Sequence, residues 1–344
     1  MGRLEGKVAL VTGSGRGIGR AVAITMAREG AAVVVNDLGT GIGGDGQDAS
    51  VAQLVVDEIT AAGGKATANT ESITDHAAAG RMVEQAIDTF GRIDIVVNVA
   101  GILRDRMIFN MSEEEWDAVS AVHLNGSFNT VKHAAVVFRQ QRSGRFINFS
   151  SVSAWGSPGQ PNYGAAKYGI LGLTAVLANS MNRYGVTSNA ILPYAATRMI
   201  DSTPRAQKVL EETGKLPSEL AAGTEGDPFN VAPMVAYLAT DEAQGINGQF
   251  FGVHGTQIQL YSHWEAAAAV KAEARWDPKA LAEIFGETLG SHLELPEQQV
   301  VPGRDRPQRG TAVWQQDPSQ WVALGPGVEV WTRTRYFDAK GQGA

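Results

Sequence analysis

The sequence contains no cysteine among its 344 residues, so disulfides, cysteine metal sites and thiol nucleophiles are excluded. It also lacks an apolar run long enough to span a bilayer, and its start, MGRLEGKVALVTG, runs directly into a strand pattern. Basic residues number 29 against 36 acidic ones, with no basic run, which argues against nucleic acid or an anionic membrane as partner. We therefore expect a cytoplasmic protein that acts on a small molecule.

Short apolar runs of strand length alternate with helical stretches along most of the chain. Several runs are apolar at consecutive positions, as expected for strands that helices cover on both faces. This alternation predicts βαβ units and an α/β fold with a doubly wound, Rossmann-like parallel sheet. The predicted strands are 8–12, 32–36, 65–69, 93–98, 145–149, 187–192 and 248–253.

The chain changes character after residue 257. We assign residues 1–257 to a dinucleotide-binding catalytic domain and 258–344 to a C-terminal helical and short β extension that packs on the core or on a partner subunit. The extension has two helical patterns, 263–276 and 277–294, and one alternating strand pattern, 328–337. The strand pattern is able to pair with 313–316 or with 321–324. Three tryptophans there suggest a small aromatic cluster: Trp314, Trp321 and Trp331.

Residues 12–19, TGSGRGIG, follow the first predicted strand and open the first predicted helix. Glycine at positions 13, 17 and 19 permits a tight turn, close approach of the backbone to a phosphate, and close packing of the helix on the strand. The N-terminus of the helix then offers free N–H groups and a partial positive charge to a pyrophosphate. In this strand–turn–helix context the loop predicts a dinucleotide site.

Asp37 ends the second predicted strand, in VVVNDLG. A carboxylate at this point can accept hydrogen bonds from the adenosine ribose hydroxyls and would repel a 2′-phosphate, which favours NAD over NADP. Arg16 is an argument for NADP, because a guanidinium could pair with the 2′-phosphate. The same side chain could equally lie over the adenine. We expect NAD as the cofactor.

Tyr163 and Lys167, in NYGAAKYG, are four residues apart, so on a helix their side chains project together. A lysine cation beside a phenol favours the phenolate and lowers its pKa, and such a tyrosine can exchange a proton with a carbonyl or alcohol oxygen. The pattern alone is common on helix surfaces. Its context is specific: one strand ends in a serine pair at 150–151 and another in Asn98 and NVAG, both where ligands bind in parallel sheets.

Taken in order, TGSGRGIG, NVAG, the serine pair and YGAAK resemble the short-chain dehydrogenase/reductase family over roughly 5–254. More narrowly, GRIDIVVNVAGILRDRM, HLNGSF and GQPNYGAAKYGILGL are similar to the (3R)-hydroxyacyl-CoA dehydrogenases of multifunctional enzymes. The resemblance implies hydride transfer between NAD and a secondary alcohol or ketone. A 3-hydroxyacyl thioester is one such substrate. A steroid, terpenoid or aromatic alcohol is an alternative substrate, and a non-catalytic dinucleotide-binding scaffold is an alternative function.

By the same resemblance, Tyr163 is the general acid/base, Lys167 binds the nicotinamide ribose, and Asn125 supports a proton-relay water. The residues implied around the cofactor are Gly13, Arg16, Gly17, Ile18, Gly19, Asp37, Ser72, Ile73, Asn98, Ala100, Gly101, Tyr163, Lys167, Pro193 and Thr197. Homodimers or homotetramers are implied as well, with 113–142 and 161–184 as candidate interface helices. We expect 194–228 to form a mobile lid over the substrate.

The catalytic serine is ambiguous. The usual family interval back from Tyr163 reaches Ser150, whereas the register of the strand RFINFSS selects Ser151 and requires a loop one residue shorter. We choose Ser151, because strand register fixes the direction of a side chain more firmly than loop length does. We expect His123 to be a packed histidine, and we assign no metal because the histidines are scattered.

Overall fold

The computed structural model describes residues 2–273 and 275–293, and the backbone of 314–315, 321–325, 328–332 and 334–335. The chain divides into two compact units, Met1–Tyr261 and Ser262–Ala344. The predicted boundary at residue 257 falls at the start of the last strand of the first unit.

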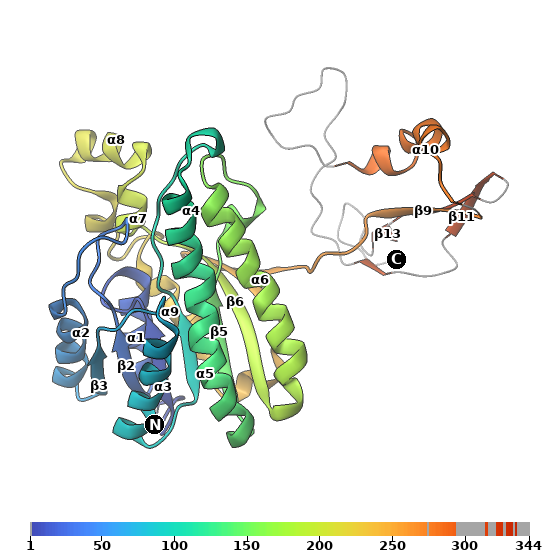
Figure 1. Ribbon diagram of the computed structural model, residues 1–344. Helices are drawn as coiled ribbons and strands as arrows, with labels where there is room; N and C mark the ends of the chain where they lie inside the picture. Colours follow the sequence, from blue (N-terminus) through green and yellow to red (C-terminus); the bar gives the residue numbers. More distant parts are fainter. Residues whose placement is uncertain are drawn as a thin grey trace. The chain divides into compact units, whose positions relative to one another are not determined.

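The first unit is built on one eight-stranded sheet with the order β3-β2-β1-β4-β5-β6-β7-β8 (Figure 1). Its strands are β1 (Val8–Thr12), β2 (Ala32–Asn36), β3 (Lys65–Asn69), β4 (Ile95–Asn98), β5 (Gly144–Phe149), β6 (Val186–Tyr194), β7 (Phe250–His254) and β8 (Gln257–Tyr261). Strands β1 to β7 are parallel, and β8 is antiparallel to β7. The strand order reverses between β1 and β4, which leaves a crevice at their carboxyl ends.

Helices cover both faces of this sheet, as the consecutive apolar positions of its strands predict. Ala9 and Val11 of β1 pack with α1, α2 and α9 on one face, while Val8 and Leu10 pack with α3, α5 and α6 on the other. The α-helices of the unit are α1 (Gly17–Arg28), α2 (Ser50–Ala61), α3 (His76–Phe90), α4 (Glu113–Ser120), α5 (Gly126–Gln141), α6 (Pro161–Met181), α7 (Arg198–Asp201), α8 (Pro204–Thr213) and α9 (Ala232–Leu238). The predicted doubly wound sheet is therefore confirmed.

Two irregular segments bear on the site. A π-helical turn, Ala121–Asn125, joins α4 to α5, so the predicted interface helix 113–142 is three consecutive elements. The predicted lid, 194–228, contains α7, α8 and the 3₁₀ turn Pro217–Glu219, and it ends at the first residue of a second 3₁₀ turn, Pro228–Asn230. Among the described residues, no helix has the length and apolar character needed to cross a membrane.

The second unit contains a three-stranded antiparallel sheet with the order β11-β12-β9 and a pair β10-β13. Its elements are β9 (Ala268–Ala272), α10 (Pro278–Phe285), β10 (Trp314–Gln315), β11 (Trp321–Gly325), β12 (Val328–Thr332) and β13 (Thr334–Arg335). The helix predicted over 263–276 is wrong: alanine-rich β9 is held as a strand by its ladder with β12. The predicted tryptophan cluster lies outside the described side chains.

Candidate active site

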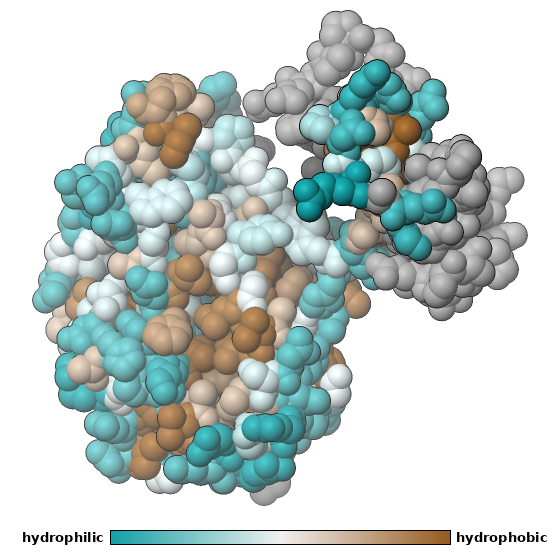
Figure 2. Space-filling model, turned by 45° about the vertical axis from the view of Figure 1, so that its right-hand side comes forward, coloured by the Kyte–Doolittle hydropathy of each residue, from teal (hydrophilic) through white to brown (hydrophobic). Residues whose placement is uncertain are grey.

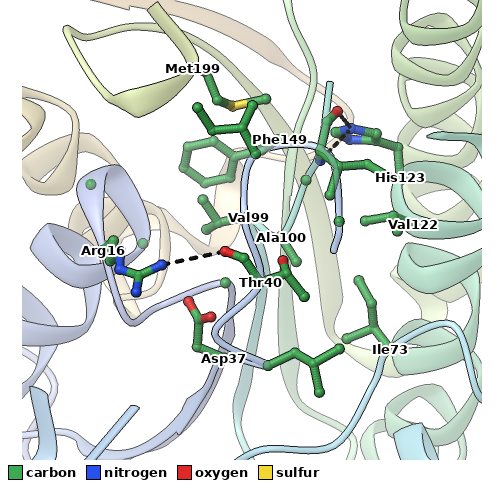
Figure 3. A pocket seen from close by; sticks show the side chains of 18 of the residues that line it. Arg16, Asp37, Thr40, Ile73, Val99, Ala100, Val122, His123, Phe149 and Met199 are labelled. Carbon is green, nitrogen blue, oxygen red and sulfur yellow. Dashed lines mark hydrogen bonds between the residues drawn. The ribbon is translucent and has the colours of Figure 1, made fainter. Parts of the chain in front are cut away.

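A cavity of about 530 Å³ opens at the carboxyl ends of the parallel strands (Figure 3). The loops after β1, β2, β3 and β4 line it, together with the π-helical turn, the start of α6 and the segment after β6. All the predicted cofactor residues except Asn98 contribute to this lining. Asn98 is buried below it, where its amide donates to Asn148 Oδ1 (2.9 Å) and its Oδ1 accepts from Thr130 Oγ1 (2.7 Å).

The glycine loop forms a cradle that larger side chains would fill. Gly13 and Gly17 have φ values of +63° and +52°, in the left-handed region that favours glycine. A Cβ on Gly13 would lie 2.6 Å from the Cα of Ala100, and one on Gly19 would run into the carbonyl oxygen of Gly13. Helix α1 starts at Gly17, so its free N–H groups face the cavity. The loop therefore fits a pyrophosphate.

Asp37 uses both carboxylate oxygens to hold backbone. Oδ2 accepts from the N–H of Gly15 (2.8 Å) and Oδ1 from the N–H of Gly39 (2.7 Å). Each carboxylate oxygen keeps a further lone pair, so the group can still accept from ribose hydroxyls. Arg16 lies beside it and donates to the carbonyl of Thr40 at 3.4 Å (Figure 3).

Arg198 brings a second guanidinium to this end of the cavity, and sequence reasoning missed it. Burial and the charge of Arg16 lower its pKa, while Asp37 and Asp201 oppose the effect. The region around Asp37 therefore carries two cations, and its charge does not by itself exclude an extra phosphate.

Tyr163 and Lys167 project from the first turns of α6, as the four-residue spacing predicts. The Lys167 ammonium lies 5.5 Å from the centre of the Tyr163 ring and donates to the carbonyl of Phe149 (2.6 Å). Burial lowers the pKa of Lys167 to about 7 and raises that of Tyr163 to about 12. The tyrosine pKa was expected to fall towards neutrality, but in the cofactor-free chain it is raised, because burial of the phenol is the largest influence on it.

The two serines have different partners. Ser150 is buried and its hydroxyl donates to the carbonyl of Lys167 (2.7 Å), so it holds α6 against β5. Ser151 precedes a 3₁₀ turn and its Oγ accepts from the N–H of Ser153 (3.1 Å). Burial raises the pKa of Tyr163, and a hydrogen bond between its oxygen and the side chain of Ser151, which stabilises the phenolate, partly offsets the rise. Ser151 thus lies against the tyrosine hydroxyl, and Ser150 is the serine of the pair that contributes to the lining of the cavity.

Asn125 does not reach the site. It is the last residue of the π-helical turn, it is exposed, and it does not line the cavity. His123, two residues earlier, lines the cavity and packs its ring edge-to-face on Tyr163, with ring centres 5.0 Å apart. Side chains two residues apart on a helical turn point to roughly opposite sides, so only one of the pair can face the site. The predicted role of Asn125 is therefore corrected, while the prediction of a packed histidine agrees with the burial of His123.

A phosphate cradle, a carboxylate after β2 and a tyrosine–lysine pair at the switch point of a doubly wound sheet define the site of a dinucleotide-dependent oxidoreductase. The family model described as Enoyl-(Acyl carrier protein) reductase matches residues 13–255. The chain belongs to the short-chain dehydrogenase/reductase family, whose members bind a nicotinamide dinucleotide, and the predicted family is confirmed.

Three relatives show how far the similarity extends. Hydroxyacyl-CoA dehydrogenase ChsB1 of Mycobacterium tuberculosis is 42% identical, over 81% of this chain and 87% of that protein. Peroxisomal multifunctional enzyme type 2 of Mus musculus is 43% identical over 72% of this chain, which spans only 32% of that longer protein. A crystal structure of a short-chain dehydrogenase from Mycobacterium avium is 45% identical with a TM-score of 0.73, over 84% of this chain and 96% of that one.

Proposed function

We propose that the chain is an NAD-dependent dehydrogenase of a 3-hydroxyacyl thioester. The observation that carries the proposal is the Tyr163–Lys167–Ser151 group beside the glycine cradle, in a chain similar to hydroxyacyl-CoA dehydrogenases. NAD, when bound, accepts the hydride, and its ring carries a positive charge that favours a nearby phenolate.

The residues of the chain handle the proton. In the oxidation, Tyr163 accepts the proton of the substrate hydroxyl while hydride leaves the carbon that carries this hydroxyl. In the reverse reaction, Tyr163 returns the proton to the substrate oxygen. Ser151, hydrogen-bonded to the tyrosine, orients the substrate oxygen. Lys167 is anchored by the Phe149 carbonyl and keeps two further N–H groups for a ribose hydroxyl.

The preference for NAD rests on Asp37, which faces the expected ribose position and disfavours a 2′-phosphate. Arg16 and Arg198 favour the opposite choice. Titration of the chain with NADH and with NADPH, followed by cofactor fluorescence, tests the proposal. We expect NADH to bind at least tenfold more tightly, and equal or tighter NADPH binding would remove the role given to Asp37.

The segment that follows β4 favours an apolar substrate body over a strongly anionic one. The segment after β4 exposes Ile108 and Phe109, at 64% and 76% of their surface. Its two arginines are engaged: Arg104 donates to the carbonyl of Gly43 (2.8 Å) and Arg106 pairs with Glu115 (2.7 Å). A steroid, terpenoid or aromatic alcohol therefore stays as the second candidate substrate.

A substrate screen followed by NADH absorbance separates these candidates, using 3-hydroxyacyl-CoAs, hydroxysteroids and cyclic alcohols. With the best substrate, Tyr163→Phe should lower kcat about 10²- to 10⁴-fold while NADH still binds, because only the proton-transferring oxygen is lost. Tyr168→Phe, an exposed position on the same helix, is the matched control and should retain turnover. Unchanged turnover in Tyr163→Phe would show that the mechanism is wrong.

We further propose that the chain self-associates through α5 and α6. These helices expose Phe128, Val136, Tyr168 and Val176, and apolar side chains gather on the side that comes forward in Figure 2. A second copy of the same face would cover them in a symmetric dimer or tetramer. Light scattering of the wild type and of Val176→Glu tests this: we expect an oligomer that the charged variant dissociates.

A further inference from the structure

The connection between β2 and α2, residues 37–49, is much longer than the roughly two to six residues usual between a strand and a helix. Its two ends meet, because the N–H of Asp48 donates to the carbonyl of Leu38 (3.1 Å). This close approach requires glycine at position 39, where a Cβ would run into the carbonyl oxygen of Asp48. Residues 38–48, here called the strap, therefore form a loop that is closed at its base.

The strap passes the glycine cradle. In the sheet, β1 lies between β2 and β4, so a chain that leaves β2 and contacts the segment after β4 has to cross the carboxyl end of β1, where the cradle begins. The strap makes that contact: the N–H of Leu103 donates to the carbonyl of Ile42 (3.0 Å). Strap residues line the cavity on the way, among them Thr40 and Ile42 (Figure 3). A dinucleotide in this cavity would therefore lie between the strap and the ends of the strands.

Arg104 holds the strap from the side of β4. Its Nε donates to the carbonyl of Gly43 (2.8 Å), and a terminal nitrogen lies 3.5 Å from a carboxylate oxygen of Asp45. The first bond carries the contact, because Asp45 is 88% exposed and an ion pair in water adds little. Gly44 allows the close approach: its φ is +92°, and a Cβ there would lie 3.2 Å from the side chain of Ile102.

The backbone that carries Arg104 is firmly anchored. The amide of Asn162, a fully buried residue at the start of α6, donates to the carbonyls of Arg104 (2.9 Å) and Glu115 (3.0 Å). Its Oδ1 accepts from the N–H of Tyr163 (2.7 Å). Arg104 therefore presents its guanidinium from a fixed base, whereas the glycine-rich strap regains much backbone freedom once it is released.

We propose that Arg104 is a positioning residue for the cofactor: it latches the strap across the cavity, and the strap has to open before a dinucleotide enters or leaves. The inference goes beyond the proposed function and needs only that the chain binds a nicotinamide dinucleotide. The latch joins protein atoms alone, so it raises the barrier to entry and the barrier to exit by the same amount. It therefore sets the rates of cofactor exchange and leaves the affinity nearly unchanged.

Two substitutions of equal length isolate the latch. Methionine and glutamine both end near the position of Arg104 Nε, and only glutamine has an N–H to donate there. Arg104→Met should raise the association and dissociation rate constants of NADH about tenfold each, the scale of a hydrogen bond from a charged group, with Kd within about threefold of the wild type. Arg104→Gln should keep both rate constants within about threefold of the wild type.

Stopped-flow NADH fluorescence measures both rates, by mixing for association and by a chase with excess NAD for dissociation; NADPH and NADP replace them if they bind more tightly. Arg106→Met is the matched control. This arginine belongs to the same segment but pairs with Glu115 (2.7 Å), so its loss should leave both rates at their wild-type values. The side chain of Arg104 is 28% exposed, so we expect both of its variants to fold, which thermal melts check.

A rise in the dissociation rate constant alone would overturn the proposal, because Arg104 would then contact the dinucleotide and not only the strap. Equal rates in Arg104→Met and the wild type would overturn it as well, since the strap would not obstruct exchange. A chain that shows the expected rates but turns over no substrate would refute the proposed function and leave the latch intact. A chain that turns over its substrate with unchanged exchange rates would do the reverse.

Discussion

Replacing Lys167 by methionine should stabilise the fold at low pH while abolishing turnover. Burial lowers the pKa of this amine from 10.5 to about 7. A tenfold change in proton affinity corresponds to about 1.4 kcal/mol, so the lowered proton affinity of this amine destabilises the folded chain by about 5 kcal/mol at pH 6 and by about 2 kcal/mol at pH 9. Between pH 7 and 10.5 the unfolded chain binds this proton and the folded chain does not, so the free energy of unfolding rises with pH across that window.

The substitution also removes the hydrogen bond from Lys167 to the Phe149 carbonyl (2.6 Å), which costs about 1–3 kcal/mol at every pH. The net gain of Lys167→Met is therefore about 2–4 kcal/mol at pH 6 and near zero at pH 9. Their difference, about 2.5 kcal/mol, does not depend on the hydrogen bond, because that contribution cancels between the two pH values.

Urea unfolding of the cofactor-free chain at pH 6 and pH 9, followed by circular dichroism, measures this difference. Lys132→Met, at an exposed position of α5, is the matched control, and its effect should be the same at both pH values. An effect of Lys167→Met that is equal at pH 6 and pH 9 would refute the reasoning, since the amine would then titrate alike in the folded and unfolded chain.

Further substitutions test the site. Ser151→Ala should lower kcat about 10²-fold with little effect on folding. Ser150→Ala should keep turnover and lower the free energy of unfolding by about 1–2 kcal/mol, because it removes the hydrogen bond to the Lys167 carbonyl. Steady-state kinetics and thermal melts separate the two variants, and the reverse pattern would move the catalytic role to Ser150. Gly101→Ala should displace the His123 ring and lower both turnover and melting temperature, because the added Cβ would run into the imidazole Cε1. Wild-type behaviour of Gly101→Ala would show that the ring has room to move.

The parallel strands could be predicted closely from the sequence because burial on both faces leaves a strong signal. Strands β1, β2 and β3 have the predicted bounds, and the others differ by a few residues at their ends. Strand β8 was not predicted, since its residues are mostly exposed and its sequence, QIQLY, has no buried run. Alanine-rich β9 was predicted as a helix because local preference favours one, and pairing with β12 decides otherwise.

The site could be predicted wherever a residue type fixed the geometry. The glycine cradle, Asp37 and the pair on α6 are of this kind. The predicted role of Asn125 does not agree with the structure, because chain position does not reveal which way a side chain faces in a π-helical turn. The direction of the Tyr163 pKa could not be predicted for a different reason: the sequence shows a neighbouring lysine but not how deeply the phenol is buried.

Asp37 ties the phosphate loop at Gly15 to the segment that begins at Gly39, one carboxylate oxygen to each. It is therefore a structural brace, in addition to the selection of the ribose that we propose for it. A single exchange of this aspartate for a small neutral residue, the simplest way to engineer acceptance of a 2′-phosphate, would release both backbone segments and weaken binding of either dinucleotide. Changing the cofactor of this enzyme should thus begin from added cations beside Arg16, with the brace left in place.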